Sequence, residues 1–477
     1  VYNASAPSPE RVYAGRLTHD LSDVKWWRQL YGEMGALGIN HTAPLVTYGL
    51  KAIYPTQIPE LHQDEDWAEA GFDPLQVLLD VSAENGIEVY PAVWLYRDAS
   101  PELAERVIRE LIDLYGDHPA FAGVVPSVEA NPTYAITSKD FIDLSRTVKQ
   151  IDPDLGVMDY PNAPFSPTII QTIMARSQSG QIDVQNVQFH PSDRRWDGGF
   201  AFARGLTHFV MGLAPAIRSI VHTHYKYGGG LRWIQNDDLY RVHQAATLTA
   251  TPDGTPIFLF GNAMYGRTAS KNLDDPMPRR LAWYAGILGV QRMIPWLDDA
   301  KPDNAVAVMV PRHTREQSLL TIERAWLPLT EAHIGAHFFS DEQNIGERTQ
   351  AIVVRGLQWC SPEQVRLIER FAVGGGAVFA WFTPEPPEVA EADGRTRAAI
   401  GSTYEQGWEP SGVDGAFAKA IGLDDATGAV GPFDPREVAW GDGVVYLTPL
   451  ETAVPADQEI PEAPLVDWIA AHTPDRA

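Results

Sequence analysis

The sequence predicts an α/β protein: a (β/α)8 TIM barrel, then a small doubly wound α/β domain, then a short C-terminal region. Strand and helix patterns alternate eight times in about 280 residues, and a barrel of this kind has eight strand–helix units in a chain of about that length. The strands are apolar throughout, as buried parallel strands are. A second strand–helix series then begins. We therefore place the barrel at 10–295, the second domain at 303–390, and a loop-rich region with a strand and a helix at 391–477.

The first five strand–helix units have the clearest boundaries. Gly38 ends the first helix, Asn85-Gly86 ends the second, and Ser100-Pro101 begins the third. The fourth helix begins with a cap at Thr137 or Ser138. We expect strands at 11–17, 41–47, 88–95, 121–128 and 156–160, and helices at 23–37, 73–85, 101–116, 138–151 and 166–178.

The remaining units follow the same order. Three more strands are expected at 182–189, 217–225 and 256–262, with helices at 198–213, 237–250 and 276–288. In the second domain we expect strands at 304–310, 336–341, 350–356 and 377–382, and helices at 321–333 and 361–373. The C-terminal region adds a strand at 443–449 and a helix near 464–472.

Charge and composition exclude several classes of protein. The net charge of −25 repels nucleic acid and anionic membranes, so neither is expected as a partner. No apolar run reaches the roughly 18 residues that a membrane span needs, so membrane insertion is not expected. A single cysteine, Cys360, excludes an internal disulfide framework and a multi-cysteine metal site.

The candidate site residues follow the strands, because the active site of a barrel lies at the carboxyl ends of its strands. They are aromatic, amide, imidazole and carboxylate side chains, which suit a carbohydrate substrate: rings stack on sugar faces and polar groups bind hydroxyls. The expected substrate-binding residues are His19, Asp20, Tyr48, Trp94, Tyr96, Arg97, Asp98, Asn131, Tyr160, Gln188, His190, His222, His224, Tyr225 and Asn262.

Two carboxylates are the candidates for the chemistry. Glycosidic cleavage needs one carboxylic acid to protonate the leaving oxygen and a second carboxylate to attack the sugar or activate water. Glu129 follows an apolar strand, where shielding raises the pKa of a carboxyl group, so we predict that it is the acid. Asp159 ends the next strand and is predicted to be the second, ionised carboxylate. An ion pair with Arg97, or a loop contact, is the structural alternative for Glu129.

Two other functions stay open. His190, His222 and His224 could form the metal site of a metal-dependent barrel hydrolase. An H-x-H spacing is a weak motif, and no acidic fourth ligand stands at a defined spacing, so we expect no metal and no cofactor. Alternatively, the chain is a catalytically inactive glycan-binding barrel. The absence of a carboxylate in the seventh predicted strand and at its end supports this last hypothesis.

A resemblance adds to these predictions. The segment QAIVVRGLQWCSPEQVRLIERFAVGGGAVFAWF resembles the glutamine-amidotransferase-like domain that follows the barrel of family 42 β-galactosidases. The resemblance implies a (β/α)8 glycoside hydrolase whose acid/base residue corresponds to Glu129. The sequence departs from that family: Val128 precedes Glu129 where the family has Asn, and His222-Thr223-His224 stands where the family has a nucleophilic Glu. We therefore expect a different family on the same plan.

The resulting hypothesis is a glycoside hydrolase that acts on a poly- or oligosaccharide. Its second domain is not expected to be a glutaminase, because Cys360 lacks the flanking glycines of a nucleophile elbow. We expect this domain to brace the barrel or to form a homo-oligomer interface. The N-terminal residues lack the pattern of a signal peptide and resemble a mature N-terminus, so we expect an exported protein, periplasmic or extracellular, with a cytoplasmic one as the alternative.

Overall fold

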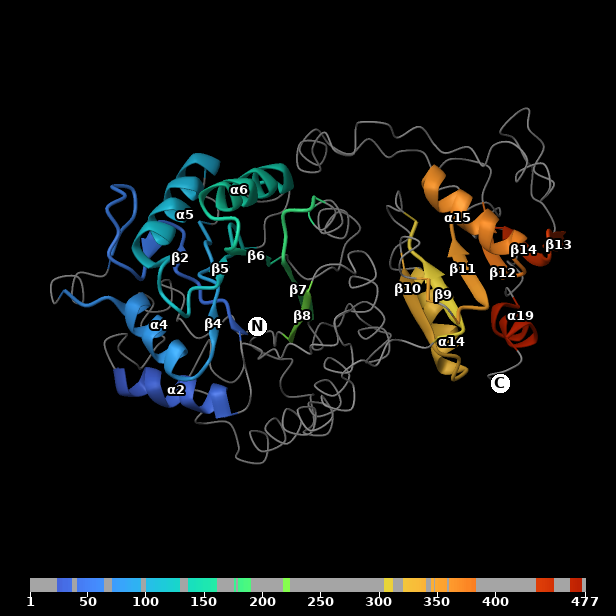
Figure 1. Ribbon diagram of the computed structural model, residues 1–477, viewed down its shortest axis with the longest axis horizontal. Coiled ribbons are helices and arrows are strands. Elements are labelled where there is room, and N and C mark those ends of the chain that lie inside the picture. The colour runs from blue at the N-terminus through green and yellow to red at the C-terminus, as the bar shows by residue number, and fades with distance from the viewer. Residues whose placement is uncertain are drawn as a thin grey trace, which may run out of the picture.

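A computed structural model describes two sets of helices and strands, which lie at the two ends of the molecule in Figure 1. The residues that it describes are 24–36, 41–63, 71–95, 100–128, 136–160, 176, 179–189, 218–223, 304–311, 321–339, 345–346, 348–357, 360–382, 435–449 and 464–473. The strands predicted at 11–17 and 256–262 and the helices predicted at 198–213, 237–250 and 276–288 lie outside these residues.

Six strands of the N-terminal set follow one another in parallel. They are β1 (His41–Thr42), β4 (Glu88–Val89), β5 (Gly123–Val124), β6 (Gly156–Asp159), β7 (Val184–Phe189) and β8 (Arg218–Thr223). β1 pairs with β4, and β5, β6, β7 and β8 pair in that order. The parallel bridges Val89–Phe121 and Ala92–Val125 join β4 to β5. These strands correspond to the second to seventh predicted strands, so the mixed α/β class is confirmed for this part of the chain.

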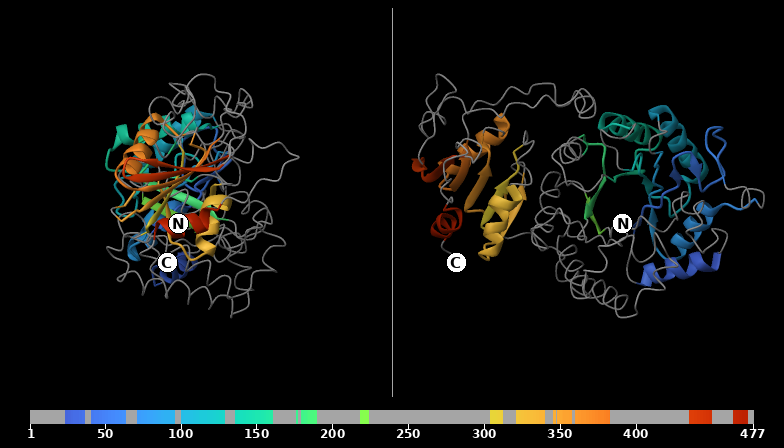
Figure 2. Two further views of the ribbon diagram at one scale, coloured as in Figure 1. Left: turned by 90° about the vertical axis from the view of Figure 1, so that its right-hand side faces the viewer. Right: turned by 180° about the vertical axis from the view of Figure 1, so that it is seen from behind.

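Four helices lie along one side of this strand series (Figure 1), and the view from behind shows the same arrangement (Figure 2). They are α2 (Val24–Ala36), α4 (Pro74–Glu84), α5 (Pro101–Tyr115) and α6 (Ser138–Ile151). Side-chain oxygens cap three of their N-termini: Asp73 accepts from Gln76 N–H, Ser100 from Leu103 N–H, and Thr137 forms a capping box. The predicted helix starts at Ser100-Pro101 and Thr137 are therefore confirmed.

The strands separate two apolar clusters. One cluster, here the helix-side core, combines strand residues such as Val89, Val124 and Val157 with buried residues of α2, α4, α5 and α6. The other, here the interior cluster, contains strand-region residues alone: Ala43, Leu45, Tyr90, Ala92, Val125, Val128, Met158, Tyr160 and Val184. Successive strand residues point to opposite sides, so membership of a cluster tells which side a strand residue faces.

A hairpin follows β1 and is fixed to the outer helix α5. The hairpin pairs β2 (Thr47–Tyr48) with β3 (Lys51–Ala52). Residues 54–57, which follow the hairpin, donate three hydrogen bonds to the Glu110 carboxylate on α5. The donors are Tyr54 Oη (3.0 Å), Thr56 Oγ1 (2.6 Å) and Gln57 N–H (2.6 Å). Burial, reinforced by the Glu110 charge, raises the pKa of Tyr54, so its hydroxyl stays a donor.

Replacing Glu110 by Gln is expected to destabilise the protein by about 1–3 kcal/mol, because one acceptor oxygen becomes an N–H donor that faces other donors. Urea denaturation measures the change. The matched control is Glu105→Gln on the same helix. Glu105 forms an exposed pair with Arg109, so this change is expected to cost less than about 0.5 kcal/mol. Equal losses of stability in the two variants would show that Glu110 does not hold residues 54–57 in place.

The C-terminal set contains a six-stranded sheet in the order β10-β9-β11-β12-β14-β13. Its strands are β9 (Val306–Met309), β10 (Ala336–Phe339), β11 (Ala351–Arg355), β12 (Ala377–Phe382), β13 (Arg436–Trp440) and β14 (Gly443–Pro449). All neighbours are parallel except β13, which pairs antiparallel with β14. Strands are present within or close to all five ranges predicted here, whereas β13 was not predicted.

Helices cover both faces of this sheet. α15 (Pro362–Val373) packs on one face, and η3 (Ile322–Trp326), α14 (Leu327–Glu331) and α19 (Leu465–His472) pack on the other. The C-terminal boundary predicted at 390 does not separate these elements. β14 pairs with β12, and α19 packs against the same apolar core, so the described part of 391–477 continues the sheet.

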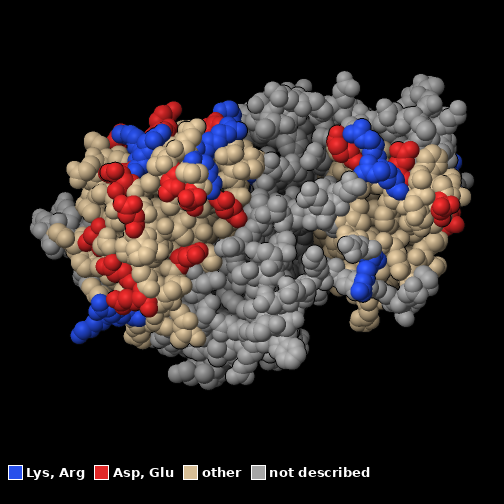
Figure 3. All heavy atoms as spheres, viewed as in Figure 1, with Lys and Arg blue, Asp and Glu red and all other residues tan. Residues whose placement is uncertain are grey.

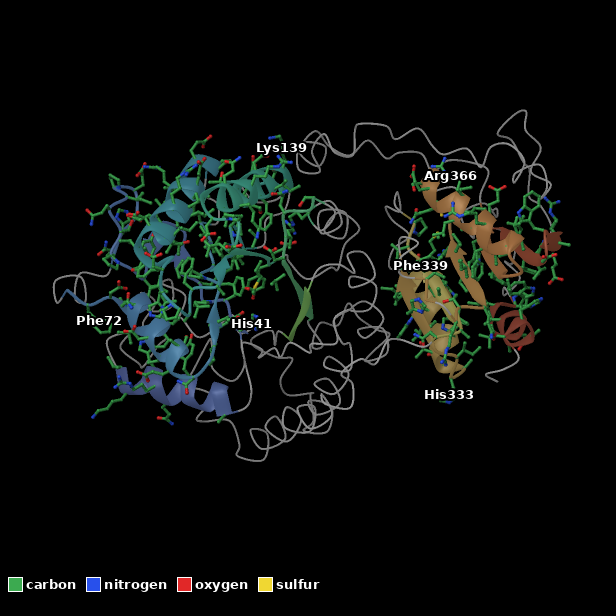
Figure 4. The ribbon with its side chains drawn as sticks, viewed as in Figure 1. His41, Phe72, Lys139, His333, Phe339 and Arg366 are labelled. Atoms are coloured by element: carbon green, nitrogen blue, oxygen red, sulfur yellow. The ribbon has the colours of Figure 1, made fainter. Side chains whose placement is uncertain are left out.

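One predicted helix, 321–333, begins as a π-helix. η3 precedes α14, and Leu327 N–H donates to Ile322 O, five residues back. Pro328 lacks an N–H, so the regular bond to the carbonyl four residues before it cannot form. His333 then ends this segment with a positive φ of 61°, at the end of α14 in Figure 4. Among the helices that the structure describes, none is both long enough and apolar enough to cross a membrane.

Charged residues of both signs are interspersed on the visible surface of the N-terminal set (Figure 3). Several form exposed ion pairs, such as Arg106–Glu60 and Lys139–Asp143, in which a side-chain nitrogen lies 2.6 Å from a carboxylate oxygen. Lys139 on α6 and Arg366 on α15 both lie on outward-facing surfaces (Figure 4). Exposed pairs of this kind contribute little to stability, which instead comes from the cores beneath them.

Candidate functional site

Trp94 is the best-placed aromatic residue among the candidates. Its side chain is partly buried and packs against the interior cluster. The hairpin holds its backbone from both sides: Trp94 N–H donates to Thr47 Oγ1 (2.8 Å), and Gly49 N–H donates to Trp94 O (2.9 Å). Tyr48, between those two contacts, is thereby held close to the backbone of Trp94. The structure thus brings together two predicted site residues from different strands.

Tyr160 is the second candidate that faces the interior. It follows β6, is 1% exposed and belongs to the interior cluster. Its backbone forms a parallel bridge with Val128, which is also in the interior cluster and directly precedes Glu129 in the chain. The ends of these two neighbouring strand segments therefore lie side by side, as the sequence predicts for a shared site.

Gln188 and His222 are register partners. They stand opposite each other in the parallel pair of β7 and β8. This pairing places two further predicted site residues next to each other near the carboxyl ends of adjacent strands.

Asp159 occupies a different position from the one predicted. It alternates along β6 with the interior residues Met158 and Tyr160, and it shares its side of the strand with Val157 of the helix-side core. Its Oδ2 lies 3.1 Å from Nε of Arg176, and both side chains are essentially inaccessible to solvent. This placement argues against the prediction that Asp159 is the second catalytic carboxylate, because the side chain faces the helices.

Eleven other candidates lie outside the described residues. They are Glu129, His19, Asp20, Tyr96, Arg97, Asp98, Asn131, His190, His224, Tyr225 and Asn262. Within the described ranges, no group of three or more His, Cys, Asp or Glu side chains is arranged to hold a metal ion. The three histidines of the metal hypothesis are not among the residues whose side chains are described.

Two residues of this region were not predicted from the sequence. Thr47 is fully buried and binds the backbone of Trp94 through its hydroxyl, and Arg176 pairs with Asp159. Arg176 could have been found by combining two signals. Strand alternation places Asp159 on the helix side, and a buried carboxylate there needs a basic partner from a following helix.

Cys360 in the C-terminal set has no property of a nucleophile. Its side chain is fully buried, and its Sγ lies 3.7 Å from Sδ of Met309. Burial raises the pKa of the thiol, which keeps it protonated at neutral pH. The prediction of a buried thiol is confirmed.

Cys360 is accordingly expected to resist a disulfide reagent such as Ellman's reagent in the native protein and to react within minutes after unfolding in guanidinium, because only the exposed thiolate attacks. The release of thionitrobenzoate measures both rates. Cys360→Ser is the control for any background reaction. A native rate close to the unfolded rate, or ammonia release from glutamine that is lost in Cys360→Ser, would contradict this assignment.

The described strands and helices define a class of fold, an α/β arrangement in which successive parallel strands lie between outer helices and an apolar interior cluster. Solved structures of glycoside hydrolases share this fold. The cold-adapted β-galactosidase from Rahnella sp. R3 aligns over 100% of this chain and 88% of its own length, with a TM-score of 0.57 and 11% identity. Gan42B, a GH42 β-galactosidase from G. stearothermophilus, aligns over 80% and 71%, with a TM-score of 0.53 and 11% identity.

A mannosidase of known structure is similar to this chain to a comparable degree. The exo-β-1,4-mannosidase Op5Man5 from Opitutaceae bacterium strain TAV5 aligns over 81% of this chain and 77% of its own, with a TM-score of 0.53 and 12% identity. No family model and no curated protein matches the sequence. The resemblance in plan to family 42 β-galactosidases is therefore confirmed, and the low identities fit a different family.

Proposed function

We propose that the chain is a glycoside hydrolase that cleaves glycosidic bonds of a poly- or oligosaccharide, with Glu129 as its general acid. The observation that supports this most is the pairing of the strand segments that end at Val128 and Tyr160, which brings Tyr160 next to the residue that precedes Glu129. The fold shared with β-galactosidases and a mannosidase supports the same proposal.

In this proposal the residues at the carboxyl ends of the N-terminal strands have different roles in the reaction. Glu129 donates a proton to the leaving oxygen, which removes the need to expel an alkoxide. Trp94 provides a rigid aromatic face for a sugar ring, because its backbone is fixed by Thr47 and Gly49. The second carboxylate comes from a residue other than Asp159, and Asp20 and Asp98 are the candidates.

A panel of aryl glycosides, both α and β and of several sugars, tests the proposal when combined with a panel of polysaccharides. Release of the aryl alcohol by the purified chain, lost in Glu129→Gln, is the expected result. The configuration of the first-formed sugar, followed by NMR, then distinguishes retention from inversion. Wild-type protein that hydrolyses none of these substrates would contradict the proposal.

A glycan-binding protein without catalysis is the second candidate. β8, which corresponds to the seventh predicted strand, includes no Asp or Glu, and His222-Thr223-His224 stands where the resembled family has its nucleophilic Glu. Calorimetry with the same sugars separates the two functions. Binding with no turnover would favour the second candidate, and turnover would exclude it.

A further inference from the structure

The hydrogen-bond ladder that begins with β1 and β4 changes at Trp94. Before that residue the ladder is regular, and Val46 N–H donates to Ala92 O (3.0 Å). A regular parallel ladder would continue with a bond from Trp94 N–H to Val46 O. Val46 O instead accepts from Ile53 N–H, which follows β3 (3.0 Å). Thr47 Oγ1 accepts from Trp94 N–H (2.8 Å), so a side-chain hydroxyl takes the place of a backbone carbonyl.

The ladder on the other side of this strand also changes by one residue at the same level. Val93 N–H donates to Val125 O (3.0 Å), so a regular ladder would continue with Ser127 N–H donating to Val93 O. Val128 N–H forms that bond instead (2.8 Å). Val125 and Val128 both belong to the interior cluster although they are three positions apart. Residues 126–127 therefore form a β-bulge, and bulges are frequent beside active sites, where they change the direction of side chains.

Trp94 lies between these two changes. Its side chain packs against the interior cluster, as the alternation from Ala92 requires, and it stays partly exposed. Its N–H is bonded to Thr47 and its carbonyl oxygen to Gly49, so the peptide groups on both sides of its Cα are fixed. These two peptide groups set the direction of the Cα–Cβ bond. The Thr47 side chain is fully buried and therefore influences the direction in which the Trp94 ring leaves the strand.

The segment that supplies Thr47 is also held by α5. The Glu110 carboxylate accepts hydrogen bonds from residues 54–57, as described above. Arg106 Nη2 on the same helix donates to Oε1 of Glu60 (2.6 Å). Residues 47–60 are thus bonded to the strand of Trp94 at one end and to an outer helix at the other.

We propose that Thr47 is a positioning residue that controls substrate affinity: its hydroxyl orients Trp94, whose ring stacks on the apolar face of a pyranose. This inference rests on the proposed glycoside hydrolase function for the identity of its ligand. Stacking requires the aromatic ring to lie along the sugar face. A change in the direction of Trp94 therefore weakens binding of the substrate and of the transition state alike, and such a loss appears in KM and not in kcat.

Two substitutions of Thr47 test the proposal. Thr47→Val keeps the shape of the side chain and removes the acceptor, whereas Thr47→Ser keeps the acceptor. With the aryl glycoside that the wild type hydrolyses fastest, Thr47→Val is expected to raise KM by about 10-fold and to change kcat by less than about 2-fold. Thr47→Ser is expected to restore KM to within about 2-fold of the wild type. An unchanged KM in Thr47→Val would overturn the role in affinity.

Thr56→Val is the matched control in the same segment. Thr56 Oγ1 donates to Glu110 and accepts from Ile58 N–H (3.1 Å), so its loss is expected to lower the Tm without raising KM. A KM as high as that of Thr47→Val would show that general loosening of the segment is the cause. Trp94→Leu removes the ring and keeps the backbone bond to Thr47. It is expected to raise KM at least as much as Thr47→Val, and an unchanged KM would contradict stacking on Trp94.

Hydrogen–deuterium exchange of the Trp94 amide, resolved by electron-transfer fragmentation, needs no activity. Slow exchange in the wild type and in Thr47→Ser, with at least about 10-fold faster exchange in Thr47→Val, supports positioning. Fast exchange in the wild type would overturn it, a measurement that remains possible if Thr47→Val does not fold. If no glycoside is hydrolysed, the hydrolase function fails by itself, and Kd values from calorimetry with the same sugars replace KM. Binding of none of these sugars would then overturn the role of Trp94.

Discussion

Replacing Glu129 by Gln is expected to lower kcat by a factor of about 100–10,000 on substrates with a poor leaving group. The change removes the proton that a general acid donates and keeps the size of the side chain. Substrates whose leaving group needs no protonation, such as dinitrophenyl glycosides, should lose much less activity, because their departure does not depend on the acid. The ratio of the two effects therefore reports on the acid role itself.

Glu84→Gln is the matched control, since Glu84 lies at the end of α4 and is about half exposed. It is expected to keep wild-type turnover on both kinds of substrate. Circular dichroism and the Tm should be unchanged in both variants. Near-normal turnover of Glu129→Gln on poor leaving groups would place the acid elsewhere, with Asp20 and Asp98 as the next residues to replace.

Replacing Phe379 by Ala is expected to destabilise the C-terminal sheet by about 3–5 kcal/mol, the cost of a large cavity in a packed core. Phe379 is fully buried on β12 and lies at the centre of a group of rings. Its centroid is 4.8 Å from that of Trp381, 4.9 Å from that of Tyr446 and 5.6 Å from that of Trp468. The loss of the ring therefore also removes one of the contacts that link the sheet to α19.

Differential scanning calorimetry measures this change. The matched control is Val373→Ala at the end of α15, where the side chain is 47% exposed and little apolar area is lost. It is expected to change the stability by less than about 0.5 kcal/mol. A Phe379→Ala protein with an unchanged transition would mean that the aromatic group does not stabilise the sheet.

The elements that local signals define were predicted well. α5 begins at Ser100-Pro101 because a serine cap and a proline at the first helical position are both local features. β11 and β12 were found because they are apolar runs next to helix boundaries. The side of the sheet on which Asp159 lies was not predicted. It follows from the alternation of residues along the strand, whereas the prediction for Asp159 used only its position after an apolar run.

β13 could have been found from its turn. Trp440 and Gly443 flank Gly441-Asp442, and Gly441 has a positive φ of 59°, as tight hairpin turns require. The strand itself begins with two charged residues, Arg436 and Glu437, and so lacks the long apolar run that marks the other strands of its sheet. Thr47 gave no local signal, because its contact with Trp94 joins residues 47 positions apart.

The antiparallel β13 also affects how folded molecules interact with one another. Without it, β14 would end the sheet and offer the backbone groups of VVYLT to any other chain, and such apolar edges seed aggregation. β13 occupies that edge and carries Arg436 and Glu437, two charges that disfavour the addition of another strand. The short hairpin of β13 and β14 is therefore expected to keep the β14 edge from pairing with another chain at high concentration.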